Sequence, residues 1–424
     1  MSTSDQDGAA PWSIAIIGAG LGGLTLTRVL QLRGVNVTLY EREPSSISRN
    51  QGGTLDMHAE SGQKALNDCK LTDEFWKIAH PEADAMKIVD KHGRVTFEDE
   101  DEPPQGELLP HQPQEQDGNH VHRQGPPGGN RPEVDRGQLR QILIDSLLPN
   151  TIKWSHDLSS CTITDNKVTL HFSKPAITKE YDVVVGADGT WSRVRPLLSP
   201  AKPEYTGVTM VDIQFSNIDS HPELSELVGR GTLSALDDNK GLIAQRNSGE
   251  KVRVYVTLKA PSSWSEDSGF SKLISSGDFH QAQQYLLTYF SDWSSSLQRL
   301  IIDCDVQNSS FAVRPLFSLP SHSWDSIGRV TLLGDAAHVM VPFAGEGANL
   351  AMLDAAELGD AIAASKNEEM LKTKVGEYEK VMLERANTAS EESLANMNLF
   401  ISEGGAEAAG ALMKQIMAGP PPGA

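Results

Sequence analysis

The chain has 424 residues, 38% of them hydrophobic, with a formal net charge of −20 and three cysteines. This length and apolar content suffice for two domains plus an extension, and they exclude a chain that is disordered throughout. The negative charge argues against nucleic acid or an anionic membrane as a general partner, so we expect small molecules instead. Cys69, Cys161 and Cys304 are too scattered for a disulfide framework or a zinc cluster, and no metal site is expected.

The chain shows no signal for secretion or membrane insertion. Its apolar runs are too short to span a bilayer, and the polar, acidic stretch from Met1 to Pro11 is unlike a signal peptide. The odd number of cysteines favours a reducing compartment. We therefore expect a cytoplasmic protein, and we expect it to be a monomer.

The first predicted unit is a strand, a glycine-rich turn and a helix. Residues 13–17 are a short apolar run typical of a buried parallel strand, and apolar positions recur at helical spacing over 21–32. In the turn, Gly18 permits a sharp bend, Gly20 lets the backbone approach a pyrophosphate, and Gly23 lets the helix pack on the strand. This order indicates dinucleotide binding; the alternative is an ordinary glycine-rich turn before a helix.

A second predicted strand supports the dinucleotide interpretation. Gly34 ends the helix, residues 35–40 alternate as a strand, and Glu41 follows directly. Its spacing along the sequence from the glycine turn is close to that at which an acidic side chain reaches the ribose hydroxyls of a dinucleotide. Glu41 and the adjacent Arg42 are therefore candidate cofactor-binding residues.

Two further loops distinguish FAD from NAD. An apolar strand at 181–185 leads to Asp188, and a strand at 330–333 leads to Gly334 and Asp335. The Asp335 carboxylate can accept hydrogen bonds from a polyol, and FAD has a ribityl chain whereas NAD has none. The alternative is that Asp335 only caps a turn.

Other residues near these loops extend the predicted cofactor site. Arg193 and Arg195 follow the second loop within reach of phosphate charge. After the third loop a helix is expected from about Leu350, and its opening can receive negative charge at the pyrimidine end of a reduced flavin. The candidates in this opening are Pro342, Gly345, Gly347, Ala348 and Asn349.

In these loops the chain resembles the class A, para-hydroxybenzoate hydroxylase type of FAD-dependent monooxygenase. The segments most similar to the tetracycline-inactivating members, which are antibiotic-resistance enzymes, are 49–58, 61–66, 132–140 and 338–347. The resemblance covers about Ile14 to about Leu358. It implies an α/β fold, with a Rossmann-like FAD-binding domain of the glutathione-reductase type, an inserted β-sheet substrate domain and a C-terminal helix.

The positions of the loops imply a discontinuous cofactor domain. The expected ranges are 1–75, 126–200 and 312–348 for the FAD-binding domain, 76–125 and 201–311 for the substrate domain, 349–402 for a helical extension and 403–424 for a flexible tail. Period-two stretches at 207–215, 241–245 and 252–258 predict strands with one face on a pocket.

One stretch, 99–132, is rich in proline, glycine and acidic residues and predicts a long loop. Its histidines, His111, His120 and His122, lack the further ligands that a metal site needs.

By the resemblance, several residues acquire roles in cofactor binding. Glu41 would bind the adenosine ribose, and the residues contacting FAD would be Asp56, Arg136 and Asp335. Arg49 matches the arginine assigned to NADPH, and Asp188 lies in the motif that serves both the FAD pyrophosphate and the nicotinamide cofactor.

The resemblance also places the substrate. Gln214 matches a glutamine of the substrate pocket, while the arginine and histidine that hold substrate in the family fall near Thr232 and Arg253. We therefore expect a flat, oxygen-rich aromatic or polyketide substrate whose polar edge bonds Gln214 and Arg253, with tetracycline as a lookalike.

The implied chemistry is carried by the cofactor. NADPH reduces FAD, and O2 then forms a flavin C4a-hydroperoxide that hydroxylates an electron-rich carbon, so no catalytic side chain is required. His338 is either a general base or a histidine packed beside the flavin. The alternatives are a non-oxygenating FAD-dependent reductase or dehydrogenase of the same fold, and a flavin-binding regulator.

Overall fold

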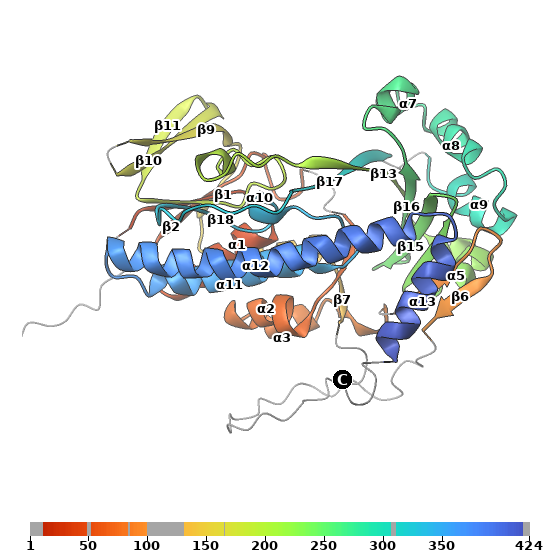
Figure 1. Cartoon of the computed structure of the whole chain (residues 1–424), viewed down its shortest axis with the longest axis horizontal. Coiled ribbons are helices and arrows are strands. Elements are labelled where there is room, and N and C mark those ends of the chain that lie inside the picture. The colour runs from red at the N-terminus through yellow and green to blue at the C-terminus, as the bar shows by residue number, and fades with distance from the viewer. Residues whose placement is uncertain are drawn as a thin grey trace, which may run out of the picture.

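The computed structural model describes residues 12–48, 52–83, 85–99, 131–164, 166–306 and 311–418. The molecule is elongated, with a parallel sheet towards one end and a larger mixed sheet towards the other (Figure 1). Within these ranges, every helix is too short or too polar to cross a membrane.

The parallel sheet joins strands from distant parts of the chain. Within the described residues its order is β18 (Val330–Leu332), β12 (Val183–Gly186), β1 (Ile14–Ile17), β2 (Val37–Tyr40) and β8 (Ile152–Lys153), with each neighbouring pair parallel. The α1 helix (Leu21–Leu32) packs on this sheet, and α11 (Glu346–Ala363) packs on α1. This is the α/β architecture that the sequence predicted, and α1 has the predicted bounds.

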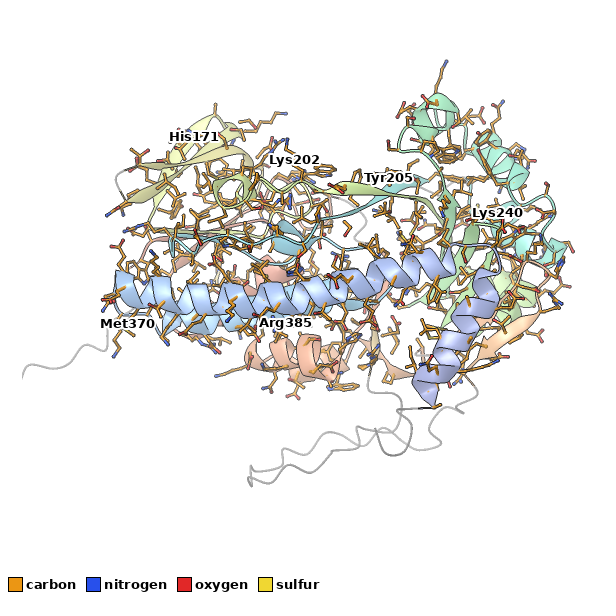
Figure 2. The ribbon with its side chains drawn as sticks, in the orientation of Figure 1. His171, Lys202, Tyr205, Lys240, Met370 and Arg385 are labelled. Carbon is orange, nitrogen blue, oxygen red and sulfur yellow. The ribbon has the colours of Figure 1, made fainter. Side chains whose placement is uncertain are left out.

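The mixed sheet contains the three strands predicted for the substrate domain. Its order in the described part of the chain is β17 (Ala312–Ser318), β13 (Glu204–Phe215), β16 (Lys251–Lys259), β15 (Lys240–Asn247), β14 (Thr232–Asp237), β5 (Met86–Val89) and β6 (Val95–Glu98). Figure 2 labels one residue near each end of this sheet: Tyr205, near the start of β13, and Lys240, at the start of β15.

One face of the mixed sheet is apolar and covered by short helices. The side chains at alternate positions, including Ile213, Val254 and Leu242, are buried with Phe270 and Leu286 in a second hydrophobic core. The covering helices are α5 (Pro222–Val228), α6 (Trp264–Asp267), α7 (Phe270–Ser275), α8 (Phe279–Thr288) and α9 (Ser295–Ile302). Because successive side chains of a strand alternate, the remaining residues face the opposite side.

Two small antiparallel sheets and several short helices complete the cofactor side. One sheet contains β9 (Asp157–Thr164), β10 (Lys167–Lys174) and β11 (Ile177–Tyr181), and the other contains β3 (Thr54–Asp56), β7 (Glu133–Asp135) and β4 (Ala79–His80). The helices are a π-helical turn at Ala59–Gln63, α2 (Lys64–Asp68), α3 (Thr72–Trp76), α4 (Arg136–Asp145) and α10 (Asp335–His338).

A long helix, α12 (Glu368–Phe400), runs along most of the molecule (Figure 1). It begins near Met370 beside the parallel sheet, and Arg385 lies midway along it (Figure 2). Val375 and Met382 belong to the first core, whereas Met397 belongs to a third core with the mixed sheet. One helix therefore joins both halves of the molecule.

The prediction of a flexible tail at 403–424 is wrong for most of its length. Residues Gly405–Met417 form α13, whose Ala406 and Ala409 are fully buried against the mixed sheet. Gly410 fits only because it lacks a side chain, since a Cβ there would lie 2.8 Å from the Thr96 hydroxyl. Small residues that suggested fraying instead provide a smooth packing face. Residues 419–424 lie outside the described part of the chain.

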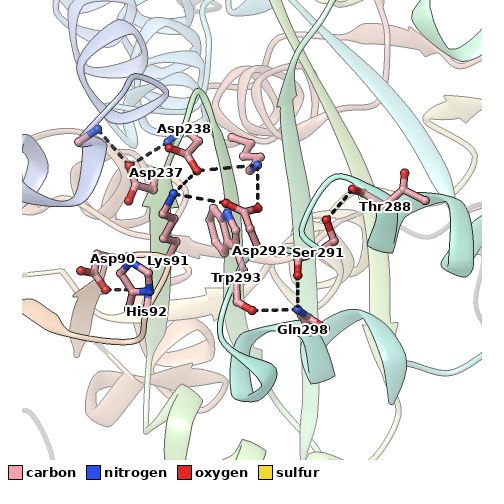
Figure 3. Close-up of polar contacts among 12 residues, drawn as sticks. Asp90, Lys91, His92, Asp237, Asp238, Thr288, Ser291, Asp292, Trp293 and Gln298 are labelled. Carbon is pink, nitrogen blue, oxygen red and sulfur yellow. Dashed lines mark hydrogen bonds and ion pairs between the residues drawn. The ribbon is translucent and has the colours of Figure 1, made fainter.

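A polar cluster closes the end of the mixed sheet next to α13 (Figure 3). Lys91 Nζ lies 2.8 Å from Asp238 and 3.3 Å from Asp292. The backbone N–H of Gly404 donates to Asp237 at 3.1 Å. These contacts tie the turns after β5 and β14 to the start of α13, so the cluster supports the fold at a distance from the predicted cofactor loops.

Candidate functional site

The three predicted loops meet at the carboxyl ends of neighbouring parallel strands β1, β12 and β18. Gly18 has φ +105°, and a Cβ there would lie 2.3 Å from the carbonyl oxygen of Ala187, so the first two loops touch where only glycine fits. Arg195 joins the other two, donating to the carbonyl oxygens of Thr190 at 2.5 Å and Ala336 at 3.2 Å. The switch region of an open parallel sheet is where ligands bind in such folds.

The turn before α1 leaves room for a phosphate. A Cβ on Gly23 would lie 2.0 Å from the carbonyl oxygen of Gly18, whereas a Cβ on Gly20 would meet nothing within 4 Å. Gly23 is thus required for helix packing, and Gly20 borders open space. In the described part of the chain no side chain caps α1 at Gly20, so its first N–H groups can bind an anion.

Glu41 lies where the sequence placed it, at the end of β2. Its carboxylate is largely buried and accepts hydrogen bonds from the backbone N–H groups of Ala19 at 2.8 Å and Glu43 at 2.9 Å. These bonds fix the carboxylate beside the glycine turn, where an acidic side chain would reach the ribose of a bound dinucleotide. The neighbouring Arg42 is exposed.

The second loop differs from expectation in how its charged side chains are used. Asp188 accepts a hydrogen bond from the backbone N–H of Arg193 at 2.6 Å, so the carboxylate shapes its own loop. Burial raises the pKa of Asp188. Arg195 was predicted to reach a phosphate, but it is 3% exposed and bonds backbone carbonyls. The third loop does present an exposed carboxylate, because Asp335 lies on the surface at the start of α10.

The opposite wall of the cleft is made by β3 and the start of α11. The helix begins at Glu346 rather than near Leu350, so Asn349 lies in its first turn. Asn349 donates to the backbone oxygen of Asp56 at 2.8 Å and accepts from the N–H of His58 at 3.0 Å. The Asn349 amide therefore ties the first turn of α11 to the end of β3.

Asp56 itself lies against the glycine before this helix. Gly345 has φ +71°, and a Cβ there would lie 3.0 Å from the Asp56 carboxylate. His58 Nε2 is 2.9 Å from the same carboxylate, and His58 Nδ1 is 3.3 Å from Glu346. Burial opposes a charge on His58, but pairing with Asp56 and Glu346 outweighs it and raises the pKa of His58 to about 9. No local pattern in the sequence marks His58 as part of the site, because its two carboxylate partners come from separate segments.

The arginines around the cleft have different environments. Arg136 is exposed at the start of α4, with its Cδ 3.7 Å from the position of a Cβ on Gly52. Arg140 is buried and donates to the carbonyl oxygens of Ala19 at 3.0 Å and Ser46 at 2.9 Å. It therefore holds the glycine turn against the following loop. Arg49 lies outside the described residues.

The predicted substrate residues form one row across the polar face of the mixed sheet. Gln214 on β13 is paired with Arg253 on β16, which is paired with Gln245 on β15, which is paired with Thr232 on β14. Residues directly opposite in an antiparallel ladder share a face. A Cβ on Gly53 would lie 2.5 Å from Gln245 Oε1, so this face is turned towards the β3 wall of the cofactor cleft.

Arg253 is ion-paired within the mixed sheet. It is buried, and its Nη1 donates to Asp212 Oδ2 at 2.6 Å, while Arg314 Nη2 donates to the same oxygen at 3.0 Å. Asp212 lies two residues before Gln214 and hence on the same face. The predicted substrate arginine is therefore part of a cluster of two arginines and one aspartate, with Arg314 its more exposed member. Period-two alternation was the signal that could have revealed Asp212.

His338 is a structural residue in this arrangement. It is buried, and its Nε2 is 2.6 Å from Asp354, which also accepts from Arg385 at 2.9 Å and from the N–H of Gly334 at 3.1 Å. Although burial opposes it, the Asp354 charge raises the pKa of His338. These contacts anchor the third loop to α11.

The residues of the cleft fit an FAD molecule. The Gly18 and Gly23 positions form a cradle that a Cβ would fill, α1 offers uncapped N–H groups, and Glu41 stands at the ribose position. Asp335 is exposed where a polyol chain would follow the pyrophosphate. These features come from separate segments and converge because their strands are neighbours.

Comparisons with known proteins agree with this geometry. Residues 12–269 and 322–393 match a family model described as an FAD binding domain. The chain is 28% identical to the monooxygenase asqM of Emericella nidulans, over 95% of this chain and 98% of that protein.

Solved structures show the same fold. Klebsiella pneumoniae HpxO, determined with FAD and uric acid, has a TM-score of 0.69 at 20% identity over 92% of this chain and 88% of that one. The tetracycline destructase Tet(51) has a TM-score of 0.66 at 19% identity over 96% of both chains. With the match to the FAD binding domain spanning most of its length, the chain belongs to the class A, para-hydroxybenzoate hydroxylase type family of FAD-dependent monooxygenases.

Proposed function

We propose that this monooxygenase uses NADPH and O2 to hydroxylate a flat, oxygen-rich aromatic or polyketide-like polycyclic substrate. The observation that carries the proposal is the polar row Gln214, Arg253, Gln245 and Thr232 on the sheet face that meets the β3 wall of the cofactor cleft. The other face of the same sheet is filled by the second core. A ligand on the polar row would therefore lie between the sheet and the cofactor.

The residues of the row suit oxygen-bearing substrates. Gln214 can donate and accept hydrogen bonds, and the Asp212, Arg253 and Arg314 cluster has one more positive than negative charge. Such a cluster stabilises an oxygen with negative charge, as on an enolate or phenolate, without leaving Asp212 unpaired. Bound FAD supplies the electron transfer and O2 activation. The chain's own residues bind and orient the substrate and keep water from the reacting carbon.

The cofactor contacts and the reductant are also proposals. We assign FAD contacts to Asp56, Arg136 and Asp335, and the NADPH contact to Arg49, because a guanidinium pairs with phosphate through charge-assisted hydrogen bonds. We further propose a cytoplasmic monomer. The free, buried cysteines Cys69, Cys161 and Cys304 support a reducing compartment.

The direct test is a substrate screen with the purified, FAD-loaded enzyme. NADPH and NADH oxidation is followed with polycyclic phenols, fused polyketides and tetracyclines, with O2 uptake and product mass recorded in parallel. We expect NADPH oxidation that one substrate class accelerates, together with the gain of one oxygen atom in the product. Reductant oxidation that yields a reduced product with no O2 uptake would instead identify a non-oxygenating reductase of the same fold.

The substrate position is tested by Gln214→Ala. Because a site built to hydrogen-bond a ligand discriminates strongly against the loss of that bond, we expect weaker substrate binding and more hydrogen peroxide released per NADPH oxidised. FAD content should stay unchanged, since Gln214 is on the sheet rather than in the cofactor loops. Ser225→Ala on α5 is the control. Unchanged affinity and coupling in Gln214→Ala would show that substrate binds elsewhere.

A further inference from the structure

Three segments that are distant in sequence meet around His58. Asp56 ends β3, His58 follows it at the start of the π-helical turn, and Glu346 is the first residue of α11. His58 is fully buried, with Nε2 2.9 Å from Asp56 Oδ2 and Nδ1 3.3 Å from Glu346 Oε1. Both ring nitrogens therefore lie close to carboxylates from different walls, and Nε2 is hydrogen-bonded to Asp56.

The backbone reinforces this arrangement. The N–H of His58 donates to Asn349 Oδ1 at 3.0 Å, and Asn349 Nδ2 donates to the carbonyl oxygens of Asp56 at 2.8 Å and Gly345 at 3.2 Å. A Cβ on Gly62 would lie 2.3 Å from Asn349 Oδ1, so the π-helical turn packs directly on this amide. The β3 end and the α11 opening are thus held as one unit.

Two carboxylates close together repel each other unless a cation stands between them. Arg131 also faces the pair, with Nη1 4.0 Å from Asp56 Oδ2, but its side chain is half exposed and is screened by water. His58 is buried between the two carboxylates. The imidazolium is therefore the group best placed to hold them together.

We propose that protonated His58 is a positioning residue of the cofactor site, clamping the Asp56 carboxylate to the first turn of α11 so that both present a fixed wall to the flavin. This inference rests on the proposed contact between Asp56 and FAD. His58 acts through Asp56 and Glu346 and does not touch the reacting atoms.

The clamp has a defined pH dependence. With the pKa of His58 raised from 6.5 to about 9, the stability it contributes is fully present below pH 6.5 and is lost as the pH rises through about 9. Within the described residues, the charged groups that act on His58 are Asp56, Glu346 and Arg131. We therefore expect FAD affinity to fall on the alkaline side, as His58 loses its proton.

The test measures the FAD dissociation constant by flavin fluorescence from pH 6 to pH 10. In His58→Gln, whose amide cannot carry the charge, we expect the constant to rise on the order of tenfold at neutral pH and the alkaline loss to disappear. Glu346→Gln keeps the histidine and removes one carboxylate, so its alkaline loss should move to lower pH. The control is His171→Gln on β10 (Figure 2), a histidine whose ring contacts Thr162 of β9 rather than the carboxylates of the clamp.

The outcomes separate this inference from the assignment of the cofactor site. Suppose that Asp56→Asn weakens FAD binding while His58→Gln binds FAD with the affinity and pH profile of the wild type. The positioning role of His58 is then wrong, and the proposed contact between Asp56 and FAD is retained. If Asp56→Asn also binds FAD normally, the flavin is not at Asp56 and both fail. If His58→Gln folds poorly, Glu346→Gln decides the matter. The proposal of a clamp is overturned if FAD affinity in Glu346→Gln falls at the same alkaline pH as in the wild type.

Discussion

At the scale of single residues, Asp335 is the clearest predicted cofactor contact. It is exposed at the start of α10, and Thr190 Oγ1 is 3.5 Å from its carboxylate. In Asp335→Ala, a hydroxyl of bound FAD loses its acceptor, which costs on the order of 1 to 3 kcal/mol. We expect FAD to bind more weakly and the purified protein to lose its yellow colour. Titration of the apoprotein with FAD measures this.

A matched substitution makes the Asp335 result specific. Asp325 is also an exposed aspartate, in the segment before β18, and Asp325→Ala should bind FAD as the wild type does. Wild-type affinity in Asp335→Ala would contradict the role of the third loop. Weaker binding in both variants would point to a general effect of negative charge instead.

At the scale of an element, the glycine turn before α1 combines two roles that substitution can separate. Gly23→Ala places a Cβ 2.0 Å from the carbonyl oxygen of Gly18, so the helix must move and the free energy of unfolding should fall. Gly20→Ala meets no protein atom within 4 Å, so the fold should be retained while FAD affinity drops. Thermal unfolding of the apoproteins and FAD titration give the two readouts. Equal FAD affinity in Gly20→Ala and wild type would exclude close approach of a phosphate there.

At the scale of the whole molecule, α12 connects the hydrophobic cores. Met382 packs in the first core and Met397 in the third, on one continuous helix of 33 residues. We therefore expect cooperative unfolding of both halves in one calorimetric transition. FAD at about 100 times its dissociation constant should stabilise the native state by roughly 2.7 kcal/mol and move that transition as a whole. Two transitions, of which FAD moves one, would show that the halves unfold independently.

Much of the cofactor side was predictable because its signals are local. Gly18, Gly20 and Gly23 follow an apolar run and precede a helical period, so strand, turn and helix follow from spacing and backbone freedom alone. Glu41 follows the next strand for the same reason. The alternating stretches of β13, β15 and β16 were equally visible, since a two-sided sheet imposes a period of two.

The tertiary structure alone decided which partners these residues meet. Arg253 is a free cation in the sequence, yet folding pairs it with Asp212, 41 residues away. His58 and Glu346 likewise come together only because β3 and α11 form opposite walls of one cleft. The small residues of α13 show no strong apolar period, so the sequence did not predict a packed helix there. Contact with β6 buries these residues in the folded protein. Local pattern fixes secondary structure through the backbone, whereas charge pairing and close packing depend on contacts between segments that no short stretch of sequence contains.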